Sequence, residues 1–313
     1  SNTDYNVYID NFQVRIPPAC PAPSANAGTN RLSSTSSEVS WTENGTATSY
    51  RVEYDTAGYA AGTARNTSVV TDTFVIISGL MSNSNYDWNV QALCSATDSS
   101  ALVGNSFTTT CGAVTLPYLE NFASYVPNCW NEAKGQLTAN TVFTSSSSFW
   151  TGDGFLNNGS TGSARMNIYA TNRFEWLISP SIDLGSTPNT YRLEFDAGLT
   201  DFSGSGTDLM GSDDTLSVVI SIDNGTTWSS ANVVKLYDVN APPANAGETV
   251  FIDLSVYTGT IKVGFYVTST ISNTDYNVYI DNFQVRIPPA CPAPSANAGT
   301  NRLSSTSSEV SWT

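Results

Sequence analysis

Histidine is absent from the 313-residue sequence. Its absence removes the commonest general base, the middle member of Ser/His/Asp and Cys/His sites, and the commonest ligand of catalytic zinc. Basic residues are scarce too, because 12 lysines and arginines stand against 27 acidic residues, which gives a formal net charge of -15. An acidic chain repels nucleic acid and anionic lipid, so neither is an expected partner. The absence of histidine therefore disfavours catalysis, and we expect a protein that is not an enzyme.

Long apolar runs and CxxC pairs are also missing. A membrane-spanning helix needs about 18 or more consecutive apolar residues, so we expect no membrane insertion and place any export signal outside this sequence. Charged residues make up only 12% of the chain and aromatic residues 11%. That balance excludes intrinsic disorder and is typical of secreted all-β proteins with polar turns.

An internal repeat is present instead. Residues 1–42 recur without a change at residues 272–313, an offset of 271. A fixed period predicts an array of similar units, so we expect a window on a long covalent chain. A terminal duplication is one alternative to this reading. Strand donation between separate subunits of a filament is another, because incomplete sandwiches expose strand edges.

One period contains four cysteines, Cys20, Cys94, Cys111 and Cys129, and Cys291 is the copy of Cys20. An even number without CxxC favours two disulfides over a metal cluster, and therefore an oxidising, extracellular setting. Four cysteines permit three pairings, and their spacing does not choose among them.

After a Pro-rich joint at 17–23, the chain reads as short strands separated by turn residues up to Cys111. The segments have the length and spacing of a β-sandwich; they are Glu38 to Thr42, Tyr50 to Asp55, Thr73 to Ile77, Tyr86 to Ala92 and Ser106 to Thr110. Trp41, the sequence Tyr50-Arg51-Val52-Glu53-Tyr54, Leu80 and Tyr86 resemble a fibronectin type III domain, in which Tyr86 is similar to the tyrosine corner. The resemblance implies such a domain at 24–111.

The same resemblance implies a disulfide pairing. In that topology the first strand begins at the pole where the sixth strand ends, which favours Cys20–Cys94. Cys111 then lies at the opposite pole of the domain and faces the next unit, which favours a bond with Cys129 of that unit. Pairing of Cys20 backwards into a preceding domain is the alternative.

From Gly112 onward the strand pattern continues with longer Gly/Ser-rich loops. Alternation is clear in segments such as Ile261, Val263, Phe265 and Val267, so we read a two-sheet jelly roll. Five motifs in order resemble the MAM-like jelly roll of bacterial surface proteins, similar to cleaved-adhesin and choice-of-anchor J modules of the Bacteroidetes; they are Pro117 to Phe122, Cys129-Trp130, Trp176 to Leu184, Ser221 to Trp228 and Tyr279 to Val285. Ser221 to Trp228 also fits an Asp-box, which we read as a structural hairpin.

This resemblance implies an all-β chain in tandem repeat. Its expected parts are the last strand of a preceding jelly roll at 1–16, the joint, the fibronectin-like domain, a jelly roll at 112–287, and the start of the next fibronectin-like unit at 288–313. The implied function is that of a giant cell-surface adhesin or extracellular fibre exported by type IX secretion, serving attachment or gliding motility. Its expected partners are neighbouring repeats, and surface polysaccharide or other cells.

Three carboxylates predict a calcium site. Strand alternation puts Asp281 on one face with Tyr279, Phe283 and Val285, and Glu120 with Tyr118 and Phe122. A carboxylate on an apolar face is costly unless a cation compensates it. First and last strands of a jelly roll are commonly neighbours, so Ca²⁺ held by Glu120 and Asp281 satisfies both.

Asp196, at the end of the strand from Tyr191 to Phe195, is a further expected ligand, and Asp213 with Asp214 makes a less favoured second site. The alternatives are pairing with Arg165, Arg173 or Lys262, or solvent exposure of the carboxylates at strand ends.

Two carbohydrate functions compete with the structural one. A carbohydrate-binding array would bind polysaccharide. Its weak candidates for glycan contact are Phe149, Trp150 and Asp153, although a position in the core is favoured for the two aromatic residues. A glycoside hydrolase is the less favoured reading, since paired acids suit a metal equally well.

Overall fold

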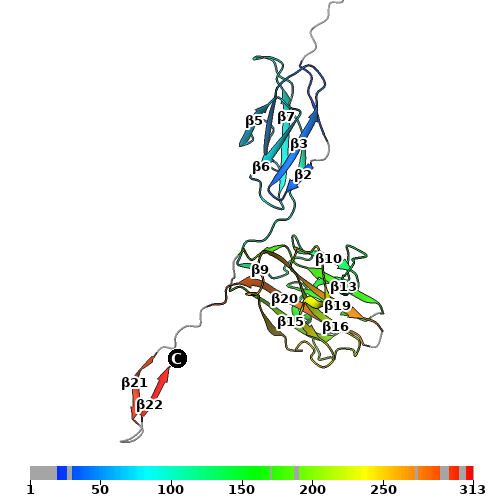
Figure 1. Cartoon of the computed structure of the whole chain (residues 1–313), viewed down its shortest axis with the longest axis vertical. Coiled ribbons are helices and arrows are strands. Elements are labelled where there is room, and N and C mark those ends of the chain that lie inside the picture. Colours follow the sequence, from blue (N-terminus) through cyan, green and yellow to red (C-terminus); the bar gives the residue numbers. More distant parts are fainter. Residues whose placement is uncertain are drawn as a thin grey trace, which may run out of the picture. The chain divides into compact units, whose positions relative to one another are not determined.

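The computed structural model describes residues 20–26, 30–169, 171–186, 190–271 and 274–289, and the backbone of two strands at 296–302 and 308–312. The strand expected at 1–16 lies outside the described residues, as do the first part of the joint at 17–23 and much of 288–313. The chain divides into two units, Ser1–Ala113 and Val114–Thr313. Each unit is described by itself (Figure 1).

Unit 1 is a sandwich of two four-stranded sheets. One sheet has the order β1-β3-β2 with β6 also paired to β3, and the other has the order β5-β4-β7-β8. The strands are β1 (Ser24–Ala25), β2 (Asn30–Ser33), β3 (Ser36–Thr42), β4 (Tyr50–Thr56), β5 (Asn66–Val70), β6 (Phe74–Ser78), β7 (Asn85–Ala92) and β8 (Val103–Thr108). The five strands expected in this unit therefore form, with boundaries shifted by a few residues.

Alternating side chains of the two sheets build the core of unit 1. Val39 and Trp41 from β3 meet Tyr50 from β4 and Trp88 from β7 in one buried cluster. Tyr86 accepts a hydrogen bond at its hydroxyl from the backbone N–H of Met81 at 3.0 Å. That bond is the tyrosine corner implied by the sequence resemblance, and it fixes the chain entering β7.

Unit 2 is a larger sandwich of two six-stranded sheets, which we call sheet G and sheet F. Sheet G has the order β10-β13-β19-β16-β17 with β14 on β19, and sheet F has the order β11-β12-β20-β15-β18 with β9 on β20. Sheet G contains β10 (Asn131–Lys134), β13 (Arg173–Ile178), β14 (Ile182–Asp183), β16 (Thr215–Ser221), β17 (Val233–Tyr237) and β19 (Thr260–Ser269). Sheet F contains β9 (Tyr118–Glu120), β11 (Trp150–Asp153), β12 (Ser163–Ile168), β15 (Arg192–Asp201), β18 (Glu248–Asp253) and β20 (Tyr276–Arg286).

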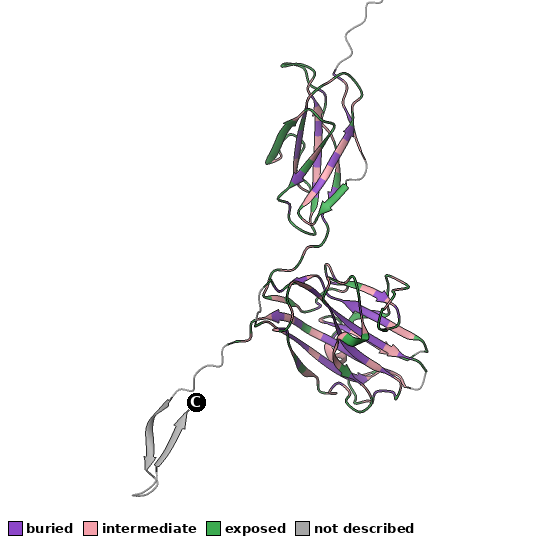
Figure 2. Cartoon of the chain, viewed as in Figure 1, coloured by how far each residue is buried: buried purple, intermediate pink, exposed green. Residues whose placement is uncertain are grey.

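The core of unit 2 lies between these sheets, and its central strands are the most buried (Figure 2). The alternating row Ile261, Val263, Phe265 and Val267 on β19 is completely buried. Helical structure in the described residues amounts to two 3₁₀ turns, η1 (Phe155–Asn157) and η2 (Ser230–Asn232). None of the described helices could cross a membrane. The all-β prediction is confirmed.

Two further strands repeat the start of unit 1. β21 (Ala296–Arg302) pairs with β22 (Ser308–Trp312), and Ala296 faces Trp312 as Ala25 faces Trp41. At the other end of the hairpin, Arg302 faces Ser308 as Arg31 faces Ser37. The two copies of the sequence therefore form strand pairs in the same register.

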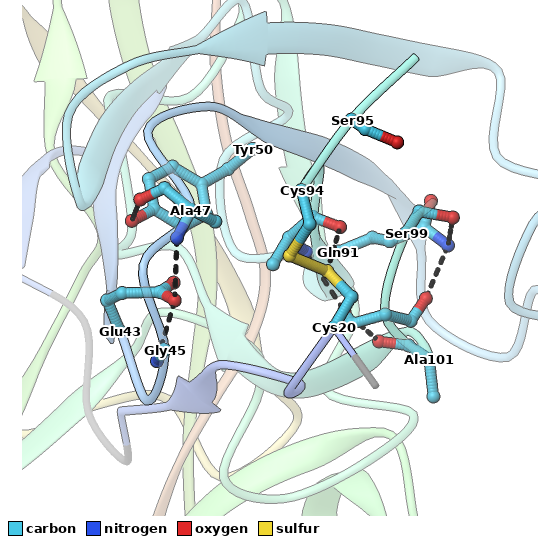
Figure 3. Close-up of a disulfide and its surroundings, with 12 residues drawn as sticks. Cys20, Glu43, Gly45, Ala47, Tyr50, Gln91, Cys94, Ser95, Ser99 and Ala101 are labelled. Atoms are coloured by element: carbon cyan, nitrogen blue, oxygen red, sulfur yellow. Dashed lines mark hydrogen bonds between the residues drawn. A yellow bond between two sulfur atoms is a disulfide. The ribbon is translucent and has the colours of Figure 1, made fainter. Parts of the chain in front are cut away.

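A disulfide closes one end of unit 1 (Figure 3). It joins Cys20, before β1, to Cys94, after β7, with Cα atoms 5.8 Å apart. Beside it the Gln91 amide donates to the Ser99 hydroxyl at 3.1 Å, as Figure 3 shows. This is the pair that the fibronectin-like topology favours. Cys111 and Cys129 are also disulfide-bonded, and their pairing with each other stays a prediction.

Removal of the Cys20–Cys94 bond is expected to destabilise unit 1 selectively. Replacing both cysteines by serine frees a loop with a sequence separation of 74, which costs about 4 kcal/mol of unfolding free energy through unfolded-state entropy. Hydrogen exchange read by mass spectrometry should show faster exchange in β7 and unchanged exchange in β19. Equal protection of β7 in both proteins would contradict the prediction.

Candidate functional site

Two aspartates lie side by side on neighbouring strands of sheet F. Asp196 in β15 and Asp281 in β20 are register partners. We expected Asp196 to end its strand, but β15 continues to Asp201. The expectation was wrong because Ala197 and Leu199 add two more core residues beyond it. Asp196 thus lies inside the sheet and points to the face opposite this core row.

A bulge in β20 changes the face of Asp281. Asn282 and Phe283 together stand opposite the single residue Phe195 of β15, because Glu194 pairs with Gln284 while Asp196 pairs with Asp281. Asn282 has the left-handed φ of 48° that such a bulge requires.

The bulge shifts the buried row of β20. The row is even-numbered up to Ile280 and odd-numbered from Phe283 onward. Asp281 therefore shares a face with Tyr279, as predicted, but it does not share the apolar face of Phe283 and Val285, and that part of the prediction was wrong.

Asn282 connects the two aspartates. Its side-chain amide donates to Asp196 Oδ2 at 2.8 Å and to Asp281 Oδ2 at 3.3 Å. Its backbone N–H donates to Asp281 Oδ1 at 2.6 Å. The Thr249 hydroxyl donates to Asp196 Oδ1 at 2.6 Å. Asn282 thus bridges the two carboxylates, and Thr249 adds a donor to Asp196 alone.

Glu120 lies at the edge of this pair. It is the register partner of Phe283, and its Oε1 accepts the Phe122 backbone N–H at 2.7 Å. Burial raises the pKa of Glu120. Burial also raises the pKa of Asp281 to about 6, and repulsion from Asp196 and Glu120 adds to that shift. Asp281 therefore lies within electrostatic reach of each of the other two favoured ligands.

These carboxylates are not paired with the basic residues named as alternatives. Arg165 forms its ion pair with Asp153, and Arg173 pairs with Glu175. Within the described ranges, no group of three or more Asp, Glu, Cys or His side chains is arranged to hold a metal. A cation here would have to displace the Asn282 amide and draw on backbone or water oxygens as well.

The second acidic pair caps the other end of β20. Asp213 Oδ2 accepts the backbone N–H groups of Thr270 and Ile271 at 2.7 and 2.8 Å. Asp214 is buried and its Oδ2 accepts the Tyr276 hydroxyl at 2.8 Å. Asp213 thus binds the backbone just after β19, and Asp214 binds the first residue of β20, so both carboxylates have a structural role.

The three glycan-contact candidates are engaged within unit 2. Trp150 is only 2% exposed and belongs to the core, in agreement with the core position favoured above. Phe149 is exposed, but Lys134 Nζ and Arg173 Cζ lie 3.8 and 3.7 Å from its ring centroid. Asp153 binds Arg165 at 3.0 Å. Of the three, Phe149 is the exposed aromatic residue and its ring already contacts two cations, while the Asp153 carboxylate is paired.

The face of sheet G away from the core carries a second apolar cluster, which contains Trp176, Trp228 and Tyr266. Phe143 packs against this cluster, with its ring centroid 5.5 Å from that of Trp176. Beside these rings lies a cavity of about 470 Å³, whose lining includes Phe143, Ser145, Trp228, Glu132, Asn131 and Lys262. This cavity was not predicted.

The hairpin from Ser221 to Trp228 forms one wall of the cavity. Asp223 Oδ1 accepts the Ser221 hydroxyl at 2.7 Å and the Thr227 N–H at 2.9 Å, and Gly225 has a φ of 83°. Trp228 is buried beneath the turn. The motif is thus the structural hairpin that we expected. A Cβ at Gly225 would lie 2.9 Å from Lys262 Cδ, so the Lys262 side chain would have to shift to make room for it.

Asp281 predicts the pH dependence of unit 2 in the presence of a chelator. Its folded-state pKa of about 6 lies above the ordinary value of 3.8, so the ionised group opposes folding above pH 6. That opposition fades as the pH falls from 6 to below 4. Asp281→Asn should therefore melt at a higher temperature than the wild type at pH 7, with a smaller difference at pH 4.

Asp253→Asn is the matched control for this calorimetric comparison. The pKa of Asp253 is lowered by the N–H and hydroxyl of Ser255, so its ionised form favours folding above the ordinary pKa. The control variant should lose stability at pH 7. An Asp281→Asn protein that melts at or below the wild-type temperature at pH 7 would refute the assignment.

Comparison with known proteins identifies one domain. No curated protein sequence matches the chain. The crystal structure of FN3tt is 18% identical, with 29% of this chain and 98% of that chain covered and a TM-score of 0.24. A structure of carbohydrate-binding modules from the β-sandwich superfamily is 12% identical, with coverages of 86% and 99% and a TM-score of 0.31.

SGBP-B from a xyloglucan utilization locus in Bacteroides uniformis is also 12% identical, with coverages of 85% and 100% and a TM-score of 0.22. Scores this low carry no argument about function. The model of the fibronectin type III domain matches residues 21–104, which lie within unit 1.

Proposed function

We propose that the chain is a structural and adhesive repeat of an extracellular protein. The observation that carries this proposal is the recurrence of residues 1–42 at 272–313, with β21 and β22 paired in the register of the first copy. The repeated sequence includes β20, which has strand partners on both edges in unit 2. A preceding unit of the same kind would supply those partners for residues 1–16.

The setting of this repeat is extracellular. Disulfide-bonded cysteines require an oxidising compartment, and a fibronectin type III domain is common in extracellular chains. With few basic residues to offset its acids, the chain repels other copies of itself. In a tandem array that repulsion keeps the polymer extended and soluble.

The finer identity follows from the sequence resemblance. It is a repeat of a giant adhesin or surface fibre of a Bacteroidetes-type bacterium, exported by type IX secretion and serving attachment or gliding. Its partners are neighbouring repeats and, at its adhesive surface, polysaccharide or other cells. The role is non-catalytic.

Calcium is the cofactor proposed for unit 2, with Glu120, Asp196 and Asp281 as its ligands. What supports the site is the electrostatic cost that Asp281 bears beside the other two carboxylates. A divalent cation would remove that cost, and backbone or water oxygens would complete its shell.

Chelation tests the calcium site. Adding Ca²⁺ at about 100 times its dissociation constant should stabilise unit 2 by about 2.7 kcal/mol and raise its melting temperature, and EDTA should reverse the change. Asp281→Asn should abolish the response to Ca²⁺, and Asp253→Asn should keep it. An equal melting temperature of the wild type with Ca²⁺ and with EDTA would sink the proposal.

Force spectroscopy tests the repeat function. In a recombinant chain of four 271-residue periods, each unit should unfold once per period. The Cys20–Cys94 disulfide withholds a segment with a sequence separation of 74, or about 26 nm at roughly 3.5 Å per residue. Replacing both cysteines by serine should therefore lengthen only the unit 1 events, by that amount. Irregular events, or equal lengths in both proteins, would contradict the proposal.

A carbohydrate-binding array is the second candidate. The cavity on the outer face of sheet G favours it, because aromatic rings, polar side chains and the Lys262 ammonium meet there. A binding role and a mechanical role are compatible in one repeat.

A further inference from the structure

The cavity on the outer face of sheet G contains a lysine without a counter-ion. The other basic residues described in unit 2 are engaged: carboxylates pair with Lys134, Arg165, Arg173, Arg192 and Arg286, and Lys235 lies over the Tyr237 ring. Within the described part of the chain, the side-chain ammonium of Lys262 makes no ion pair or hydrogen bond, although its backbone belongs to the β16–β19 ladder. Its aliphatic stem lies against Gly225, and burial lowers its pKa.

This unpaired lysine is unexpected in so acidic a protein. Acidic residues outnumber basic ones 27 to 12, so carboxylates that could pair with a lysine are abundant in this chain. A half-buried ammonium costs free energy unless something compensates it. A ligand that brings its own negative charge would do so.

The rest of the lining narrows the ligand class. Phe143 offers an aromatic ring beside the cavity, against which the C–H face of a sugar can pack. Asn131 and Ser145 supply donors and acceptors for hydroxyl groups. Glu132, held by the Tyr125 hydroxyl at 2.6 Å and the Ser148 N–H at 3.2 Å, accepts hydroxyl donors and repels a ligand that is anionic throughout.

We propose that this cavity binds a uronic acid residue of an acidic polysaccharide, with its carboxylate on Lys262 and a hydroxyl group on Glu132. A single ligand with one carboxylate and several hydroxyls matches both charges of the lining. The cavity volume of about 470 Å³ falls in the range of ~300–1,000 Å³ that is usual for ligand sites. The inference deepens the adhesive part of the proposed function, and it does not require the tandem arrangement.

Calorimetric titration with defined tetrasaccharides tests the site on the full chain. The probes are tetramers of galacturonate, mannuronate and glucuronate, each with its carboxyl-reduced neutral counterpart. At least one acidic tetramer should bind, and its neutral counterpart should bind at least about ten-fold more weakly, because a charge-assisted contact is lost. Failure of all three acidic tetramers overturns the proposal.

Two lysine variants locate the contact. Lys262→Met keeps the stem that packs on Gly225 and should weaken binding at least about ten-fold. Lys235→Met removes the same charge from the same unit outside the cavity and should leave binding unchanged. Equal loss in both variants would indicate a general charge effect and overturn the proposal, as would hexaglutamate peptide binding as tightly as the sugar.

A readout without mutation separates binding from folding. The sequence has three lysines, Lys134, Lys235 and Lys262, so ¹³C-dimethylation gives three lysine signals in an NMR spectrum. The acidic tetramer should shift the Lys262 signal and leave the Lys235 signal in place. A Lys262 signal that does not move at saturating sugar overturns the proposal. The force measurement on the repeat is unaffected by either result.

Discussion

The burial of β20 between β12 and β15 is the constraint on which unit 2 depends. This strand supplies core residues to the sandwich on both sides of its bulge, and β9, β12 and β15 all pair with it. A strand with both edges paired and an apolar row at each end cannot shift register without turning that row toward solvent. Because of the bulge at Asn282, the buried residues of this strand are even-numbered before the bulge and odd-numbered after it, and both sets face the core.

The acidic site follows from the same bulge. Because the extra residue resets the alternation after Asp281, this aspartate lies off the apolar row of Phe283 and Val285 and opposite Asp196, where Asn282 joins them by hydrogen bonds. Unit 2 thus contains a cluster of negatively charged carboxylates near its central strand β20. The Cys20–Cys94 disulfide constrains unit 1 in a different way, because it limits the unfolded chain and adds no apolar contact to the folded one.

Much of the fold could be predicted because alternation and turn chemistry are local signals. The row Ile261 to Val267 and the turn at Gly225 both appear as expected. The bulge was missed because an asparagine can take positive φ without any distinctive pattern around it, and the face assigned to Asp281 failed with it. The cavity was missed because its walls come from β10, β19 and the loop at Phe143, which only the tertiary fold brings together. Lys262, the one charged residue of β19, was the local sign of it.

Repetition of the 271-residue period in one covalent polymer is the central claim, and the mass of the protein made by its own cells tests it most directly. On a denaturing, reducing gel calibrated by mass spectrometry, we expect a chain several times heavier than the 33.4 kDa of the present sequence. Tryptic peptides spanning residues 1–42 should come from that heavy band. A protein of about 33 kDa under those conditions would contradict the account and favour assembly from separate subunits.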